Sequence, residues 1–137
     1  MKRFLYLFIA CILLLSCSAC GIHKETEPKK PSGDMVMKDE AGNVRITIDD
    51  IESVNARTIT LTSGETSYVV ELEFTEEGAV KFGDVTTELM GTTLGIYVDG
   101  ELICEPKINE AITQGSSVIN MDTYEEAQEL ADKIQGD

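Results

Sequence analysis

Apolar and polar residues alternate along several stretches of this chain, most regularly at 44–48, 58–62 and 68–74. Successive side chains of a β-strand point to opposite faces, so a period of two predicts a strand with one buried face. The clearest of the three is 68–74, in which apolar side chains alternate with glutamates. We therefore expect at least three strands in the first half of the folded region.

Helical spacing predicts two helices. After Thr75, a suitable N-cap residue, two glutamates occupy the first turn and apolar residues recur every three or four positions as far as Leu89. Gly91 is placed to end this helix. The second helix is predicted to begin at the capping box Thr123-x-x-Glu126, which precedes an apolar stripe.

A hairpin is predicted between these helices. Apolar residues alternate at 94–98, Asp99-Gly100 is a strong turn sequence, and Pro106 ends the strand that follows. One more short strand is expected at 118–119. Because strands and helices follow one another without a regular βαβ order, the predicted fold class is α+β, a sheet with its helices on one face. The predicted core residues are Val70, Leu72, Phe74, Phe82, Leu89, Ile96, Val98, Leu130 and Ile134.

The N-terminus has the features of an export signal. Lys2 and Arg3 precede an apolar run at 4–15, which is shorter than the roughly 20 residues that a spanning helix needs. Small residues then precede Cys17 and Cys20, and the pattern resembles a bacterial lipobox that fits Cys17 somewhat better than Cys20. An ordinary signal peptide with incidental cysteines is the alternative. The sequence thus predicts a lipoprotein signal peptide at 1–16, a flexible tether at 17–34 and one folded domain at 35–137.

The charge and the chemistry of the side chains exclude several functions. The chain has 25 acidic and 11 basic residues, a net charge of −14, which would repel nucleic acid and anionic lipid surfaces. Cys104 is predicted to be a buried, inert thiol, and the only histidine, His23, falls in the tether, so Cys/His catalysis is not expected. Acidic clusters at 49–52, 76–77 and 125–126 lack the spacing of a calcium-binding loop, and two of them fit helix starts. We expect no metal, no cofactor and no enzymatic activity, with a carboxylate-pair hydrolase as the enzymatic alternative.

Four segments follow one another in an order and at a spacing that resemble a known family. They are 69–82, which contains Phe74-Thr75-x-Glu77-Gly78-Ala79; 94–100, which ends in Val98-Asp99-Gly100; 106–115, which runs from Pro106 through Ile108-Asn109-Glu110 and Ile112 to Gly115; and 124–131, which begins Tyr124-Glu125-Glu126-Ala127. Together they look like the head subdomain of the large extracytoplasmic domain of SecD and SecDF. The chain departs from the family in having Asn120 and Asp122 where members usually have a glycine and an aromatic residue.

The resemblance implies both a fold and a function. The implied fold is a ferredoxin-like sheet with two helices packed on one face. The implied function is that of a binding module in contact with unfolded polypeptide that emerges from the Sec channel. The sequence contains no twelve-helix membrane region, so we expect a head without proton-driven pulling, held on the extracytoplasmic side of a bacterial membrane by lipid.

The candidate binding residues lie on two surfaces. One is the segment from Asp99 to Gly115, where partly exposed Ile108 and Ile112 are expected to form an apolar ledge. The other is the polar face of the sheet, which is predicted to consist of Thr47, Thr58, Thr60, Glu71, Glu73 and Tyr97. Its negative charge would favour basic segments of a polypeptide. The alternative is that this face is solvated and binds nothing. The candidate residues are Tyr97, Asp99, Gly100, Pro106, Ile108, Ile112 and Gly115, with Cys17 and Cys20 as candidate lipid anchors. The expected partner is an extended polypeptide or, alternatively, an envelope protein bound with no role in secretion.

Overall fold

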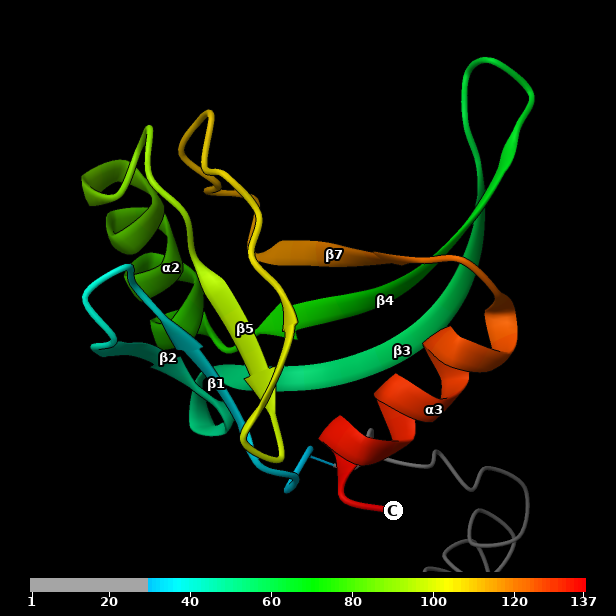
Figure 1. Cartoon of the computed structure of the whole chain (residues 1–137), viewed down its shortest axis with the longest axis horizontal. Helices are drawn as coiled ribbons and strands as arrows, with labels where there is room; N and C mark the ends of the chain where they lie inside the picture. Colours follow the sequence, from blue (N-terminus) through cyan, green and yellow to red (C-terminus); the bar gives the residue numbers. More distant parts are fainter. Residues whose placement is uncertain (1–29) are drawn as a thin grey trace, which may run out of the picture.

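Two antiparallel sheets and two helices make up the computed structural model, which describes residues 30–137 (Figure 1). Sheet A has the strand order β2-β1-β5-β6, and sheet B has the order β3-β4-β7. In chain order the elements are β1 (Met35–Lys38), β2 (Val44–Thr47), the short 3-10 helix η1 (Ile48–Asp50), β3 (Ile51–Thr60), β4 (Thr66–Phe74), α2 (Glu76–Glu88), β5 (Gly95–Val98), β6 (Glu101–Cys104), β7 (Ser116–Met121) and α3 (Tyr124–Gln135).

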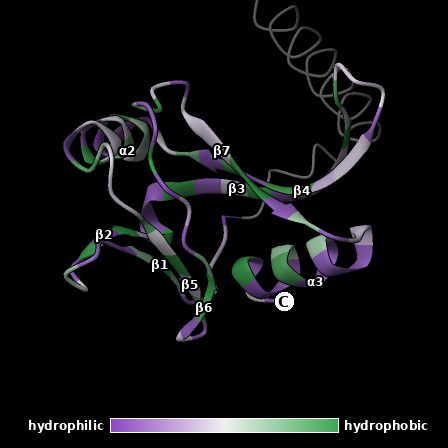
Figure 2. Ribbon diagram, turned by 45° about the horizontal axis from the view of Figure 1, so that its top comes forward, coloured by the Kyte–Doolittle hydropathy of each residue, from purple (hydrophilic) through white to green (hydrophobic). Residues whose placement is uncertain are grey.

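The predicted α+β class is confirmed, but the expectation of one sheet with both helices on one face is wrong. After β2 the chain turns through η1 and enters β3 directly, which starts a second sheet. Helix α3 packs against the three strands of sheet B, whereas α2 contacts β2, η1 and β4. Figure 2 shows the two helices at separate places on the molecule, with α3 carrying both hydrophobic and hydrophilic residues.

The local predictions that depend on caps and turns are confirmed. The Thr75 hydroxyl accepts a hydrogen bond from the Gly78 amide at 3.0 Å and begins α2. Thr123 does the same for α3 with the amide of Glu126, at 3.2 Å. Asp99 and Gly100 both have positive φ, 52° and 78°, as a tight turn between β5 and β6 requires.

The face assignment of β3 is wrong in its second half. Ile59 pairs with Ser67, so its side chain lies on the same face of sheet B as Glu71 and Glu73, while Thr58 and Thr60 share the face of the buried strand residues. This half of β3 belongs to a long hairpin that extends beyond the body of the molecule (Figure 1). Because neither α2 nor α3 covers the end of this hairpin, packing within residues 30–137 does not dictate which of its faces is apolar.

One hydrophobic core joins the two sheets and both helices. All predicted core residues are in it, and each is buried except Leu89, which is half-buried against the same cluster. The rings of Phe74 and Phe82 stack with centroids 4.4 Å apart and thereby connect β4 to α2. Exposure of Val44 (50%) and Leu61 (44%) shows that two further residues predicted to face inward lie outside the core.

The segment before β1 is fastened to the end of α3. The amides of Ser32 and Gly33 donate to the carbonyls of Gln135 and Ile134, at 3.1 and 3.0 Å. Pro31 is buried. Residues 31–33, which the sequence analysis assigned to the tether, therefore pack against the folded domain.

In residues 30–137 neither helix combines the length and the apolar character needed to cross a bilayer.

Candidate functional site

A groove of about 580 Å³ lies between β7 and the segment that follows β6. We call it the inter-sheet groove, because one wall belongs to the edge of sheet A and the other to the edge of sheet B. Its lining residues are Met37, Phe82, Thr86, Leu94, Ile96, Cys104, Glu105, Pro106, Lys107, Ile108, Asn109, Glu110, Ile112, Ser117, Val118, Ile119 and Asn120. In Figure 1 the β6 segment and the chain after it run close to the start of β7.

The floor of the groove is apolar and rigid. Met37 reaches it from β1, Phe82 from α2 and Ile96 from β5, while Leu94 directly precedes β5, and all four belong to the buried core. Core side chains are held by close packing, so the shape of this floor is fixed before any ligand arrives. An apolar side chain placed there would remove both itself and the floor from water.

One wall of the groove is the free edge of β7, and the other is the end of β6 with the segment that follows it. Within residues 30–137, β7 pairs only with β4 and β6 pairs only with β5. Consecutive residues of β7, from Ser117 to Asn120, line the groove, although their side chains alternate between the two faces of sheet B. The groove therefore runs along the edge of the strand, where backbone N–H and C=O groups have no strand partner.

A smaller depression of about 160 Å³ extends the groove toward α3. It shares Cys104, Ile119 and Asn120 with the groove and adds Asp122 and Glu126. On the β7 side the combined lining runs from residue 117 to residue 122. Six residues of extended chain are roughly 20 Å long, so the two depressions together match a short extended segment.

The wall opposite β7, formed by the segment after β6, is the outer wall of the groove. It is anchored by hydrogen bonds to α2 and to the turn after α2. The buried hydroxyl of Thr86 accepts a hydrogen bond from the Ile112 amide at 2.9 Å. The Ile108 amide donates to the Thr92 carbonyl at 2.9 Å, and its carbonyl accepts from the Gly91 amide at 2.8 Å. These bonds hold the segment 106–112 at a fixed distance from β7.

Cys104 lies at the point where the two depressions meet. The sequence analysis predicted a buried, inert thiol, but the residue is half-buried and lines both depressions, because β6 is an edge strand. Burial raises the pKa of the Cys104 thiol above its ordinary value. The thiol is therefore accessible to a ligand in the groove while remaining protonated near neutral pH.

The predicted binding residues do not form one cluster. Pro106, Ile108 and Ile112 line the groove; Ile112 is half-buried, but Ile108 is only 6% exposed, so the expectation of partial exposure is wrong for Ile108. Ile108 belongs to the hydrophobic core, and Ile112 packs against it. Gly115 has a φ of 80° and lies outside the groove against Ala79 of α2.

The remaining candidates lie elsewhere in sheet A. Tyr97 is half-buried, and the Lys38 ammonium lies 4.7 Å from its ring centroid. Asp99 and Gly100 form the hairpin turn, whose Asp99 amide donates to the Asp34 carbonyl at 2.9 Å. Cys17 and Cys20 lie outside the described residues. Tyr97, Asp99 and Gly100 thus stay predictions that the groove does not include.

The predicted polar face does not exist as one surface. Thr47 and Tyr97 belong to sheet A, whereas the other four members belong to sheet B. Its carboxylates are already paired: Glu71 forms an ion pair with Arg57 at 2.6 Å, and Glu73 accepts from the Ser53 hydroxyl at 2.8 Å. These pairs favour a solvated face over a binding surface.

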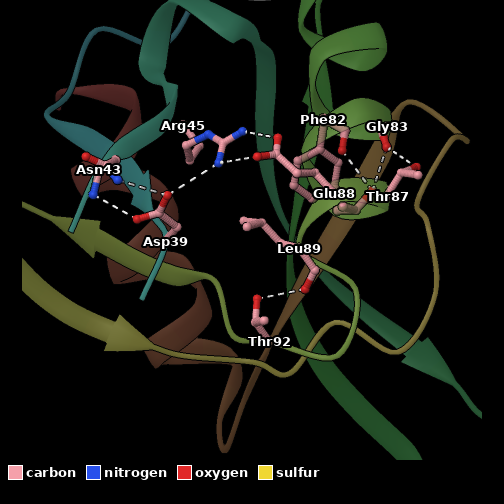
Figure 3. A network of polar contacts seen from close by, with 10 residues as sticks. Asp39, Asn43, Arg45, Phe82, Gly83, Thr87, Glu88, Leu89 and Thr92 are labelled. Carbon is pink, nitrogen blue, oxygen red and sulfur yellow. Dashed lines mark hydrogen bonds and ion pairs between the residues drawn. The ribbon is translucent and has the colours of Figure 1, made fainter. Parts of the chain in front are cut away.

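A second concavity, of about 480 Å³, lies between β2 and α2. Charged residues of its lining form ion pairs within the protein. Arg45 contacts Asp39 at 3.3 Å and also Glu88 of α2 (Figure 3). The backbone amide of Asn43 donates a hydrogen bond to the Asp39 carboxylate, and this bond is the main cause that lowers the pKa of Asp39. Hydrogen bonds from the side-chain amide of Asn43 and from Arg45 also lower this pKa. The bond to Glu88 raises the pKa of Arg45. This network fastens sheet A to α2 and has its charges largely matched.

Several residues that line the groove were not predicted to be binding residues. Val118, Asn120 and Glu105 were not singled out as binding residues, because an alternating pattern does not reveal which strand ends at an edge of a sheet. Asn120 and Asp122 were noted only as departures from the family pattern. Both residues lie in this site: Asn120 lines the groove, and Asp122 lines the smaller depression that extends it.

Comparisons with known proteins identify a family and similar solved structures. The profile of the SecDF P1 head subdomain matches residues 25–137. The SecDF protein translocase subunit of Thermus thermophilus is 46% identical over 63 residues, covering 45% of this chain and 9% of that protein. A solved structure of SecDF in a super-membrane-facing form has a TM-score of 0.59 and 32% identity, covering 93% of this chain and 16% of the other. A structure described as a membrane component SecDF that enhances protein export has a TM-score of 0.58 and 37% identity, covering 69% and 41%.

These matches define an α+β head module related to protein-translocase subunits. The chain belongs to the SecDF P1 head subdomain family. It spans between 9% and 20% of the length of the curated SecD and SecDF relatives that it matches.

Proposed function

We propose that this chain is a lipid-anchored extracytoplasmic module whose inter-sheet groove holds an extended, unfolded segment of polypeptide without catalysing a reaction. The observation that carries the proposal is the groove itself, which has the free edge of β7 along one side and an apolar floor. Membership of a family of protein-translocase head subdomains supports the same ligand class.

An extended polypeptide suits this geometry for a physical reason. A peptide that lies beside β7 can pair its backbone with the free edge, which gives affinity independent of sequence. Alternate side chains of such a peptide point toward one side, so every second residue would meet the apolar floor. Because backbone pairing supplies much of the binding, the groove suits many different unfolded chains.

Photo-crosslinking tests where the polypeptide binds. A photoreactive residue is placed in the full chain at Val118 in the groove, at Tyr97 on the outer face of sheet A, or at Val80 on α2 as a control. Val118 and Val80 are 48% and 65% exposed, so both are accessible. With an unfolded polypeptide as target, we expect crosslinks from Val118 and not from Val80.

Crosslinks from Tyr97 alone would move the binding surface to sheet A. No crosslink at any position, together with no measurable affinity for unfolded chains, would contradict polypeptide binding. That result would favour the alternative of an envelope-interaction lipoprotein that reuses the head fold.

The lipid anchor requires a test of its own. The proposal rests on the short apolar run and the lipobox-like residues before Cys17 and Cys20. A diacylated cysteine carries two chains, which is enough for stable anchoring. The double variant Cys17→Ala, Cys20→Ala should no longer incorporate labelled fatty acid or remain with the membrane, and each single variant identifies the acylated residue. Membrane retention of the unlabelled double variant would contradict the anchor.

A further inference from the structure

The rim of the inter-sheet groove carries an excess of negative charge. Glu105 and Glu110 lie on the wall that follows β6, and Asp122 and Glu126 lie where the groove extends toward α3. The basic residue of this lining is Lys107. All of these carboxylate residues are exposed.

These carboxylates have no cationic partner in the described part of the chain. The ion pairs between side chains there involve Asp39, Glu88, Glu71 and Asp50, none of which lines the groove or its extension. Glu105 accepts one hydrogen bond, from the Thr93 hydroxyl at 3.1 Å. Lys107 offsets part of this charge and the rim remains net negative. On the outer face of sheet B, by contrast, Arg57 pairs with Glu71.

The floor and the rim select different side chains of one ligand. In an extended segment paired with β7, one set of alternate side chains faces the apolar floor and the other set faces away from it, beside the rim. We propose that the preferred ligand is an extended segment in which apolar residues alternate with lysine or arginine. This inference rests on the proposed function and specifies the substrate class of the same groove.

Binding of matched peptides to the full chain tests the inference. Three unstructured peptides of about twelve residues share the same apolar positions and carry lysines, glutamines or glutamates between them. Exposed opposite charges contribute modestly and are screened by salt. We expect the lysine peptide to bind about tenfold more tightly than the glutamate peptide at low ionic strength, with the glutamine peptide between them and the difference shrinking at high salt.

A variant with a neutral groove rim separates the effect of the rim carboxylates from the effect of the protein's net charge. The variant Glu105→Gln, Glu110→Gln, Glu126→Gln should lose most of the preference for the lysine peptide over the glutamine peptide. The matched control Glu52→Gln, Glu65→Gln, Glu129→Gln changes the net charge equally at exposed carboxylates outside the groove and should keep the preference.

The outcomes are distinguishable. If no peptide binds, the proposed function itself fails. If all three bind equally, or if the control loses the preference as fully as the groove variant, polypeptide binding stands and the assignment of a basic ligand to this rim is overturned.

Discussion

Two glycines of α2 show how much the surroundings of a single residue matter. A Cβ added at Gly78 would lie 2.1 Å from the Asp50 carbonyl oxygen, because the first turn of the helix packs directly on the backbone of η1. A Cβ added at Gly83 would meet its nearest neighbour, the Thr113 methyl, at 3.6 Å, an ordinary contact. Helix propensity alone would favour alanine at both positions.

Alanine substitution should therefore have opposite effects at these two positions. Gly78→Ala forces two backbone segments apart and is expected to destabilise the fold by about 1 to 3 kcal/mol or more. Gly83→Ala is expected to be neutral or to stabilise by up to about 1 kcal/mol. Urea unfolding of both variants measures the difference, and equal stabilities would show that α2 does not approach η1 this closely.

Cys104 provides a prediction about pH. Alkylation requires the thiolate, and burial raises the thiol pKa, so the alkylation rate of the folded protein should rise at a higher pH than that of the urea-unfolded protein. Labelling at Cys104 is followed by mass spectrometry of the peptide that contains it, across the neutral to alkaline range. A midpoint at or below that of the unfolded chain would mean that the thiol is not shielded beside the groove.

Among the elements, α2 links the core to the groove. Phe82 stacks on Phe74 and also forms part of the groove floor, so one helix supports both the fold and the site. The hydrogen bond from the Ile112 amide to Thr86 adds the outer wall to the same helix. Loss of packing on this side should therefore affect stability and binding together.

Truncation of Phe82 measures this packing. Phe82 is 4% exposed, and Phe82→Ala is expected to destabilise the protein by roughly 3 to 5 kcal/mol. Val80→Ala on the same helix, at a side chain that is 65% exposed, should change stability by no more than about 0.5 kcal/mol. A loss below about 1 kcal/mol for Phe82→Ala would show that α2 is not docked through this ring.

Elements with strong local patterns are predictable from this sequence, and others are not. Strand β4, the two helix starts and the Asp99-Gly100 turn depend on nearby residues, and the structure has all of them. Strand β1 was not predicted, because its first three residues are all apolar and show no alternation. The first half of β3 was missed because a register shift between Ile51 and Ser53 interrupts its alternation.

At the scale of the whole molecule, the groove depends on which strands end each sheet. Pairing of β1 with both β2 and β5 leaves β6 at one edge of sheet A, and pairing of β4 with β3 leaves β7 at one edge of sheet B. No local pattern encodes these long-range pairings. Of the two isoleucines predicted to form a ledge, Ile108 is buried in the core and Ile112 is half-buried, and both line the groove.

The central claim is that an extended polypeptide pairs with the free edge of β7 in the inter-sheet groove. Amide hydrogen exchange measures this directly, because a backbone N–H that gains a partner exchanges more slowly. On addition of the lysine-containing peptide, we predict slower exchange in residues 117–122, and unchanged exchange in β2 and in β3, which are edge strands outside the groove. If exchange in residues 117–122 is unchanged at a saturating peptide concentration, or if it slows in β2 or β3 instead, the account is contradicted.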